Sequence, residues 1–257
     1  MKYLNDVNYK DCVGKVCKSK SSGDFKILKY NNNRNVEIRF LNTGFETIVQ
    51  LTNIRNGEIK DPYSASVYGV GVSGSRYPYK INGVKTKEYV LWKSVLQRCY
   101  SDSFKKKHPT YEGCGVSDNF KSYEYFYEWC HKQIGFGVEG FELDKDLLIK
   151  GNKVYSESTC VFVPTEINLL LVKREASRGE HLIGVCWSKT HKAFKATVRR
   201  NKGKQEFLGY FKTELEAFNA YKTAKESFVK EQANEWKGKI DERVYEALMN
   251  YTVEITD

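Results

Sequence analysis

Residues 182–233 read LIGVCWSKTHKAFKATVRRNKGKQEFLGYFKTELEAFNAYKTAKESFVKEQA, and this stretch decides the fold class of the chain. It divides into three short strand-like runs, separated by polar turns, and one longer run with helical spacing. The pattern predicts three strands followed by one helix. The predicted strands are Leu182–Lys189, Ala193–Arg200 and Lys204–Lys212.

The helix of this stretch is expected to begin at Thr213, a residue type that caps helix N-termini well. Glu214 and Glu216 follow in the first turn, where the helix dipole favours negative charge. Small residues in its apolar stripe allow the helix to lie close against a sheet. The stripe consists of Ala217, Ala220, Tyr221, Ala224 and Phe228.

The middle strand sorts its side chains onto two faces, because successive residues of a strand point to opposite sides of a sheet. Phe194, Ala196 and Val198 should face the helix. Lys195, Thr197 and Arg199 then lie on the uncovered face. A sheet with a helix on one face and cations on the other suits the major groove of DNA, which admits a β-ribbon.

Charge is concentrated in the same region. The 257-residue chain has 42 Lys and Arg against 32 Asp and Glu, a net charge of +10. Between Val172 and Lys239 there are 16 Lys and Arg against 8 Glu, so most of the excess lies there. Clustered positive charge predicts a nucleic-acid partner, with a lysine-rich surface that binds nothing as the alternative. The helix has mixed charge on its polar face, which argues against a membrane surface as partner.

Several of these residues resemble the AP2/ERF family of DNA-binding domains. The likeness covers about 50 residues, by the count of strands and helix given above. It rests on Ile183-Gly184-Val185, the Phe194–Arg199 strand, Leu208-Gly209-Tyr210-Phe211 with Thr213, and Glu216-Ala217…Ala220-Tyr221…Ala224.

The resemblance implies that the exposed side of the three strands contacts bases and phosphates of double-stranded DNA. Plant members carry arginines at the positions of Cys186 and Ser188, so the usual guanine-reading pair is missing here. General DNA binding survives that loss better than a particular sequence preference does. By position, the contacts would come from Cys186, Ser188, Lys195, Thr197, Arg199, Gln205 and Phe207, with Lys189, Arg200, Lys202 and Lys204 as further phosphate contacts.

The cysteines and the hydropathy indicate an intracellular protein. The seven cysteines form no Cys-x-x-Cys pair, and the four histidines do not lie at zinc-ligand spacing from them, so we expect reduced thiols. No apolar run approaches the length of a membrane span, and Met1–Lys10 lacks a signal-peptide core. A cytoplasmic location follows, without a membrane partner and without a small-molecule substrate.

The rest of the chain predicts a multi-module α+β fold. Residues 1–76 should form a small β-rich domain with strands at Phe25–Asn31, Asn35–Thr43 and Glu46–Ile54. Ser64–Lys80 has the Gly, Ser and Tyr content of a linker. Beyond it we expect a central module at 86–172, the AP2-like domain at 178–240 and a tail at 241–257. The central module should contain helices at Glu88–Tyr100 and Ser122–Lys132, and the tail a helix at Asp241–Asn250 and a strand at Tyr251–Ile255.

Two phrases in the central module resemble the HNH-type (His-Me finger) homing endonucleases of phages and their relatives, which often carry an AP2-like domain downstream. The first is Trp92-Lys93-Ser94…Gln97-Arg98-Cys99-Tyr100…Pro109-Thr110-Tyr111. The second is Leu143-Asp144-Lys145-Asp146…Gly151-Asn152…Tyr155-Ser156…Cys160-Val161-Phe162-Val163…Asn168. The likeness implies a two-strand, one-helix site that grips one Mg²⁺ beside the phosphate, in a protein of an infected bacterial cell.

Within this resemblance, Asp144 takes the place of the strand carboxylate and Asn168 that of the helix ligand, so both would hold the metal. Asn152 lies in the intervening loop. Lys145 stands where the family has its general-base histidine, which is the main departure. A lysine is ordinarily protonated at neutral pH, and two flanking aspartates favour that charge. Asp146 could act as base or as a second metal ligand, since it shares a strand face with Asp144 if the strand continues.

The sequence is therefore compatible with three functions. The chain is a metal-dependent DNA nuclease, a nuclease-silent DNA-binding protein in which Asp144-Lys145-Asp146 is a salt-bridged strand, or an interaction protein. The interaction protein would be a phage counter-defence factor that binds a host protein through the aromatic residues Tyr63, Tyr68, Tyr77 and Tyr79.

Overall fold

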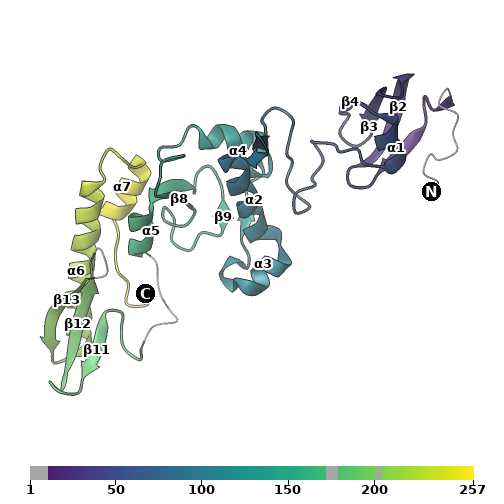
Figure 1. Ribbon diagram of the computed structural model, residues 1–257. Coiled ribbons are helices and arrows are strands. Elements are labelled where there is room, and N and C mark those ends of the chain that lie inside the picture. The colour runs from purple at the N-terminus through teal and green to yellow at the C-terminus, as the bar shows by residue number, and fades with distance from the viewer. Residues whose placement is uncertain (1–10, 172–178, 201–203) are drawn as a thin grey trace. The chain divides into compact units, whose positions relative to one another are not determined.

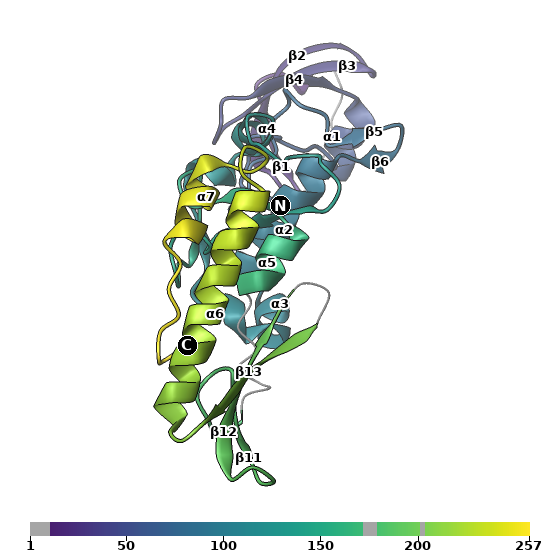
Figure 2. The same ribbon diagram turned by 90° about the vertical axis from the view of Figure 1, so that its left-hand side faces the viewer.

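The computed structural model describes residues 11–171, 179–200 and 204–257. Helices and strands mix in an α+β fold with several small sheets, shown from two directions in Figures 1 and 2. The chain divides into two compact units. The first comprises Met1–Cys130 with Lys153–Glu157, and the second comprises His131–Asn152 with Ser158–Asp257. The expected α+β class is confirmed, while the division between units runs through the expected module 86–172.

An antiparallel sheet of order β1-β2-β3-β4 forms the N-terminal part of the first unit. The sequence predicts that its last strand continues to Ile54, but β4 ends at Val49 and helix α1 follows. Leu51 and Ile54 lie three residues apart on one face of α1, and both are buried. The bounds are β1 Val16–Ser19, β2 Gly23–Asn32, β3 Asn35–Phe40, β4 Glu46–Val49 and α1 Leu51–Asn56.

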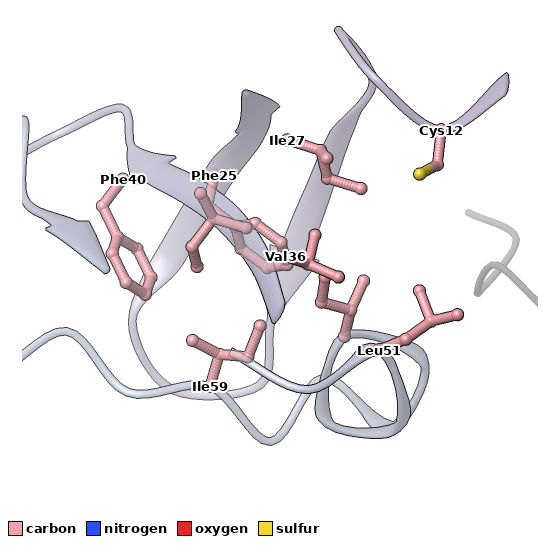
Figure 3. Packing of buried hydrophobic residues seen from close by; sticks show 9 residues of the cluster. Cys12, Phe25, Ile27, Val36, Phe40, Leu51 and Ile59 are labelled. Carbon is pink, nitrogen blue, oxygen red and sulfur yellow. The ribbon is translucent and has the colours of Figure 1, made fainter. Parts of the chain in front are cut away.

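One face of this sheet carries a hydrophobic cluster, which Figure 3 shows from close by. Phe25 and Ile27 alternate along β2, and they lie beside the alternating residues of β3. The rings of Phe25 and Phe40 lie 5.7 Å apart. The cluster is made of Cys12, Phe25, Ile27, Val36, Ile38, Phe40, Leu51, Ile54 and Ile59.

Helices, short strands and an aromatic core make up the rest of the described first unit. Helices at Lys87–Tyr100 and Tyr123–Cys130 confirm the two expected helical stretches. Most of their apolar residues are buried around Trp92 and Tyr123, but Val90 of the expected stripe is 52% exposed. The Trp92 indole N–H donates to the Phe120 carbonyl at 2.8 Å. The elements are β5 Lys80–Ile81, β6 Val84–Lys85, α2 Lys87–Tyr100, α3 Asp102–Lys107, η2 Pro109–Tyr111, β7 Gly115–Val116, η3 Asn119–Lys121, α4 Tyr123–Cys130 and β9 Val154–Tyr155.

The stretch Ser64–Lys80, expected to be a linker, packs on this core. Gly71 is buried against α2, and an added Cβ at this position would lie 2.4 Å from a Leu96 methyl carbon. Val72 pairs with Ser122 in an isolated parallel bridge. The rings of Tyr77 and Tyr127 stack at 4.0 Å, so the expected set of four exposed tyrosines is not formed. Packing of this kind is not expected of a flexible linker.

The second unit contains a strand–strand–helix arrangement and a three-stranded sheet. β8 pairs antiparallel with β10, and α5 follows β10 directly. The sheet of order β11-β12-β13 lies against α6, as Figures 1 and 2 show. The bounds are β8 Phe141–Asp144, β10 Val161–Pro164, α5 Thr165–Leu171, β11 Val185–Ser188, β12 Ala193–Arg199, β13 Gln205–Phe211, α6 Glu214–Glu235 and α7 Glu242–Met249.

Helix α6 belongs to two hydrophobic clusters. Near its start, Phe218 and Tyr221 pack with Val198 of β12. Near its end, Val229 and Ala233 pack with residues of β10, α5 and α7. The 22-residue helix therefore connects the sheet and the strand–strand–helix arrangement within the second unit.

The tail was expected to add a strand at Tyr251–Ile255, but this prediction is wrong. Val253 is buried beside the sheet, and its backbone groups bond to α6 side chains instead of to a strand. The Glu226 carboxylate accepts from the Val253 N–H at 2.9 Å, and the Lys222 ammonium donates to the Val253 carbonyl at 2.7 Å. Over the described ranges, no helix has the length and apolar character needed to cross a membrane.

Lys225 of α6 gives the second unit a specific pH dependence. Its ammonium donates to the Leu170 carbonyl at 2.8 Å, and burial lowers the pKa of Lys225 to about 8. Between pH 8 and about 10 the folded state releases this proton while the unfolded state retains it. The free energy of unfolding should therefore rise with pH in this window, by about 1 kcal/mol per pH unit relative to Lys225→Met. Urea unfolding of both proteins at pH 7.5 to 10 measures the difference, and parallel pH curves would contradict it.

Candidate functional site

The uncovered side of the β11–β13 sheet is the candidate site, and α6 determines which side is uncovered. Thr213 and Glu216 form a capping box that begins α6 directly after β13. The helix then covers Ala196 and Val198, which are fully buried as the alternation predicts. Side chains of the opposite parity lie on the uncovered side of the sheet, which we call the outer face.

The strand register defines the outer face. Lys195 of β12 lies opposite Cys186 of β11 and opposite Tyr210 of β13. Further along, Thr197 lies opposite Phe207 and Arg199 opposite Gln205. Residues directly opposite one another share a face of the sheet. The outer face thus consists of Cys186, Ser188, Ala193, Lys195, Thr197, Arg199, Gln205, Phe207 and Tyr210.

A bulge in β13 brings two aromatic residues onto the same face. The register shifts between Ala196 and Thr197, so Leu208 has no cross-strand partner. Phe207 and Tyr210 are three residues apart, yet both point outward because of this extra residue. Their rings lie 4.9 Å apart, and both are substantially exposed, at 52% and 41%.

The Phe207 and Tyr210 rings form the middle of an aromatic row, which has His191 at one end and Lys195 at the other. His191, in the turn between β11 and β12, stacks on Tyr210 with ring centres 4.0 Å apart and planes 20° apart. At the other end the Lys195 ammonium lies 5.8 Å from the centre of the Phe207 ring. Sequence reasoning missed both His191 and Tyr210, because strict alternation places Tyr210 on the helix side.

The polar residues of the outer face also contact one another. The Gln205 amide donates to the Thr197 hydroxyl at 2.9 Å. The Ser188 hydroxyl and the His191 Nδ1 lie 3.1 Å apart, within hydrogen-bond distance. The Cys186 thiol is exposed and free. These groups supply donors and acceptors of the kind that read base edges.

Arg200 lies away from the outer face, and its expected role as a phosphate contact stays a prediction. β12 ends at Arg199, and the next side chain turns toward α6. Arg200 pairs with Glu206 and, at 2.9 Å, with Glu231 of α6, and its guanidinium lies 5.2 Å from the centre of the Phe228 ring. Lys189, Lys204 and Arg199 are exposed. The remaining expected contact, Lys202, lies outside the described residues.

The strand–strand–helix arrangement holds the residues expected to be catalytic. β8 ends at Asp144, which lies opposite Val161 of β10. One Asp144 oxygen accepts from the backbone N–H groups of Asp146 and Leu147, at 2.9 and 2.7 Å. Burial raises the pKa of the Asp144 carboxyl above its ordinary value, and the backbone bonds oppose that shift. Asp144 therefore closes the turn after β8. Asp146 does not continue the strand, so the expected shared face of the two aspartates is not formed.

The Lys145 ammonium donates hydrogen bonds within this arrangement. Its ammonium, with a side chain only 12% exposed, lies 3.1 Å from the Asp146 carboxylate and 3.0 Å from the Asn152 carbonyl. The Asn152 amide donates back to the Lys145 carbonyl at 2.6 Å. These bonds fasten the loop to the end of β8. In both contacts the Lys145 side chain acts as a hydrogen-bond donor, and an ammonium has no lone pair that could take a proton from water.

Each of the two expected metal ligands is bonded to other protein groups. The Asn168 amide of α5 donates to the Glu142 carboxylate at 3.1 Å, while Asp144 bonds to its own turn. Throughout the ranges 11–171, 179–200 and 204–257, three or more His, Cys, Asp or Glu side chains nowhere gather as a metal site would require. Mg²⁺ prefers several oxygen ligands, so Asp144 and Asn168 by themselves do not fit the ion well.

A comparison of the chain with protein-family models, with curated proteins and with solved structures finds no match.

Proposed function

We propose that this protein binds double-stranded DNA through the outer face of the β11–β13 sheet. The observation that carries the proposal is the combination of cations without acidic partners and exposed aromatic rings on the one side of the sheet that α6 leaves uncovered. The resemblance of the same residues to AP2/ERF domains supports it.

The charge of the outer face favours a polyanion. No acidic residue occupies any of its nine register positions, and the one acid of β13, Glu206, lies on the other side and pairs with Arg200. Within the described part of the chain, no ion pair involves Lys195, Arg199, Lys189 or Lys204. Cations without carboxylate partners are available to phosphates, and binding them releases counterions from DNA.

The aromatic row gives the face a second kind of contact. Phe207 and Tyr210 present ring surfaces that can pack on sugars, thymine methyl groups or bases. Because stacking on unpaired bases uses the same groups, single-stranded nucleic acid is the second candidate ligand. The sheet itself favours the duplex, since a β-ribbon fits the major groove.

The proposal is tested by fluorescence anisotropy of the full chain with a labelled 30-base-pair duplex and with one of its strands. The duplex should bind at low salt, with an affinity that falls steeply as salt rises. Absence of duplex binding at low salt, or binding that salt does not weaken, would contradict it. Tighter binding of the single strand would instead support the second candidate.

We further propose that the strand–strand–helix arrangement is a nuclease-derived scaffold that does not cleave DNA. The bonds of Lys145 support this, because they engage the group that stands at the general-base position. Supercoiled plasmid incubated with the protein and Mg²⁺ or Mn²⁺ should stay intact. Metal-dependent nicking that is lost in both Asp144→Ala and Asn168→Ala would establish the nuclease and overturn the scaffold proposal.

A further inference from the structure

The hairpin of β5 and β6 in the first unit is a small structure with a well-defined turn. Lys80–Ile81 pairs antiparallel with Val84–Lys85 (Figure 2). Asn82 and Gly83 connect them with φ angles of 50° and 80°, as a two-residue hairpin turn with positive φ at both positions requires. A two-stranded hairpin is marginally stable alone, so its anchoring decides how rigid it is.

The base of the hairpin is bonded to the core of the first unit. The Thr86 N–H donates to the Tyr79 carbonyl at 3.1 Å and extends the pairing by one bond. The Thr86 hydroxyl caps α2 and lies 3.0 Å from the hydroxyl of buried Tyr123, which donates to the Pro78 carbonyl at 3.1 Å. Burial raises the pKa of Tyr123 to about 12, so this hydroxyl keeps its proton at neutral pH. Both chain ends of the hairpin are thereby fixed.

The tip combines exposed apolar groups with cations. Ile81 and Val84 lie directly opposite each other and are 57% and 71% exposed. Lys80 and Lys85 form the next cross-strand pair, although like charges in that position repel. Over the described ranges, no carboxylate forms an ion pair with Lys80, Lys85 or the nearby Lys87. The tip thus presents an exposed apolar pair on one face and, on the other, a pair of lysines without acidic partners, whose long side chains can reach around its edges.

We propose that this hairpin is a second DNA contact, which inserts Ile81 and Val84 between base pairs from the minor groove while Lys80, Lys85 and Lys87 hold the flanking phosphates. Apolar wedges of this kind partly unstack a base step and kink the duplex. The charges favour this occupant over a protein partner, because three cations around two apolar side chains complement a polyanion. The inference goes beyond the proposed function, since the hairpin and the outer face belong to different units.

The test measures bending and affinity separately, with the full chain and a 30-base-pair duplex that carries a donor and an acceptor dye at its ends. Wild-type protein should raise energy transfer by shortening the end-to-end distance. Ile81→Ser with Val84→Ser should keep the affinity within about threefold but lose most of the rise in energy transfer. Lys80→Gln with Lys85→Gln should lower the affinity about tenfold and reduce the salt dependence by about two phosphate contacts.

Matched controls come from the N-terminal sheet. Val16 and Ile48 are exposed to a similar extent as the hairpin residues, and Lys15 and Lys26 are exposed cations. Val16→Ser with Ile48→Ser, and Lys15→Gln with Lys26→Gln, should behave as wild type. Hairpin variants that match the wild type in bend, affinity and salt dependence would overturn the inference. Hairpin-dependent binding to phosphatidylserine vesicles with unchanged DNA bending would also overturn it.

Failure of this inference is distinguishable from failure of the proposed function. If Lys195→Glu weakens DNA binding while both hairpin variants match the wild type, the hairpin proposal alone is overturned. Suppose that the serine variant of the hairpin loses the bend and the glutamine variant loses affinity, while Lys195→Glu has no effect. The hairpin proposal then stands, and the outer-face proposal is overturned. A wild-type chain that binds no duplex overturns both.

Discussion

Replacing Lys195 by glutamate should lower the affinity for duplex DNA about 30-fold at 50 mM salt, because the change removes one phosphate contact and adds a repulsion. Lys195 lies at the centre of the outer face, between Cys186 and Tyr210, and its ammonium lies near the Phe207 ring. The reversal therefore affects the ionic contact and the cation–ring contact together. Anisotropy titrations at 50, 100 and 200 mM salt measure it, and the slope of log affinity against log salt should become shallower.

The matched control is Lys230→Glu, which changes the charge of the chain by the same amount on an exposed position of α6. It should weaken binding by less than about threefold, since it acts only through the general field of the protein. Equal losses in both variants would mean that net charge, and not the outer face, determines binding. Circular dichroism of both variants should match the wild type.

Replacing Gly184 by alanine should destabilise the second unit by about 2–4 kcal/mol, through backbone strain and overpacking together. Gly184 has a φ of 77°, and an added Cβ would lie 2.1 Å from the ring of Tyr221. The Tyr221 ring belongs to the cluster that joins α6 to the sheet, so it cannot move without opening that cluster. Urea denaturation followed by far-UV circular dichroism measures the loss.

Gly179→Ala provides the control for this prediction. No atom lies within 4 Å of a Cβ at Gly179, and its φ does not fall in the left-handed region. The same chemical change should therefore alter the free energy of unfolding by less than about 1 kcal/mol. A Gly184→Ala protein as stable as the Gly179→Ala protein would show that the sheet does not approach α6 as closely as described.

The sequence predicts most of the sheet and the helix of the second unit, because their patterns are local. Alternation along β12 places Ala196 and Val198 inward and Lys195 outward, and the register agrees. Alternation fails at the bulge near Leu208, since one unpaired residue reverses the parity of everything beyond it. Tyr210 and its partner His191 could therefore not be assigned to the outer face from spacing alone.

Long-range contacts explain what else the sequence could not predict. Arg200 turns away from the outer face because Glu231, thirty-one residues later, lies within 2.9 Å of it. Lys145 is engaged by Asn152 across a loop whose path no local pattern determines. The packing of Gly71 against Leu96 likewise depends on a helix that begins well after it.

The shared helix α6 has a consequence for attempts to dissect this protein. A fragment that stops before α6 removes Val229 and Ala233 from beside β10 and α5, so its strand–strand–helix arrangement would expose an open apolar side. A fragment that begins at β11 would in turn carry the uncovered second half of α6. Excision of either part by itself should therefore yield aggregating material. A folded piece must keep β8, β10, α5, the β11–β13 sheet, α6, α7 and the buried Val253 of the tail together.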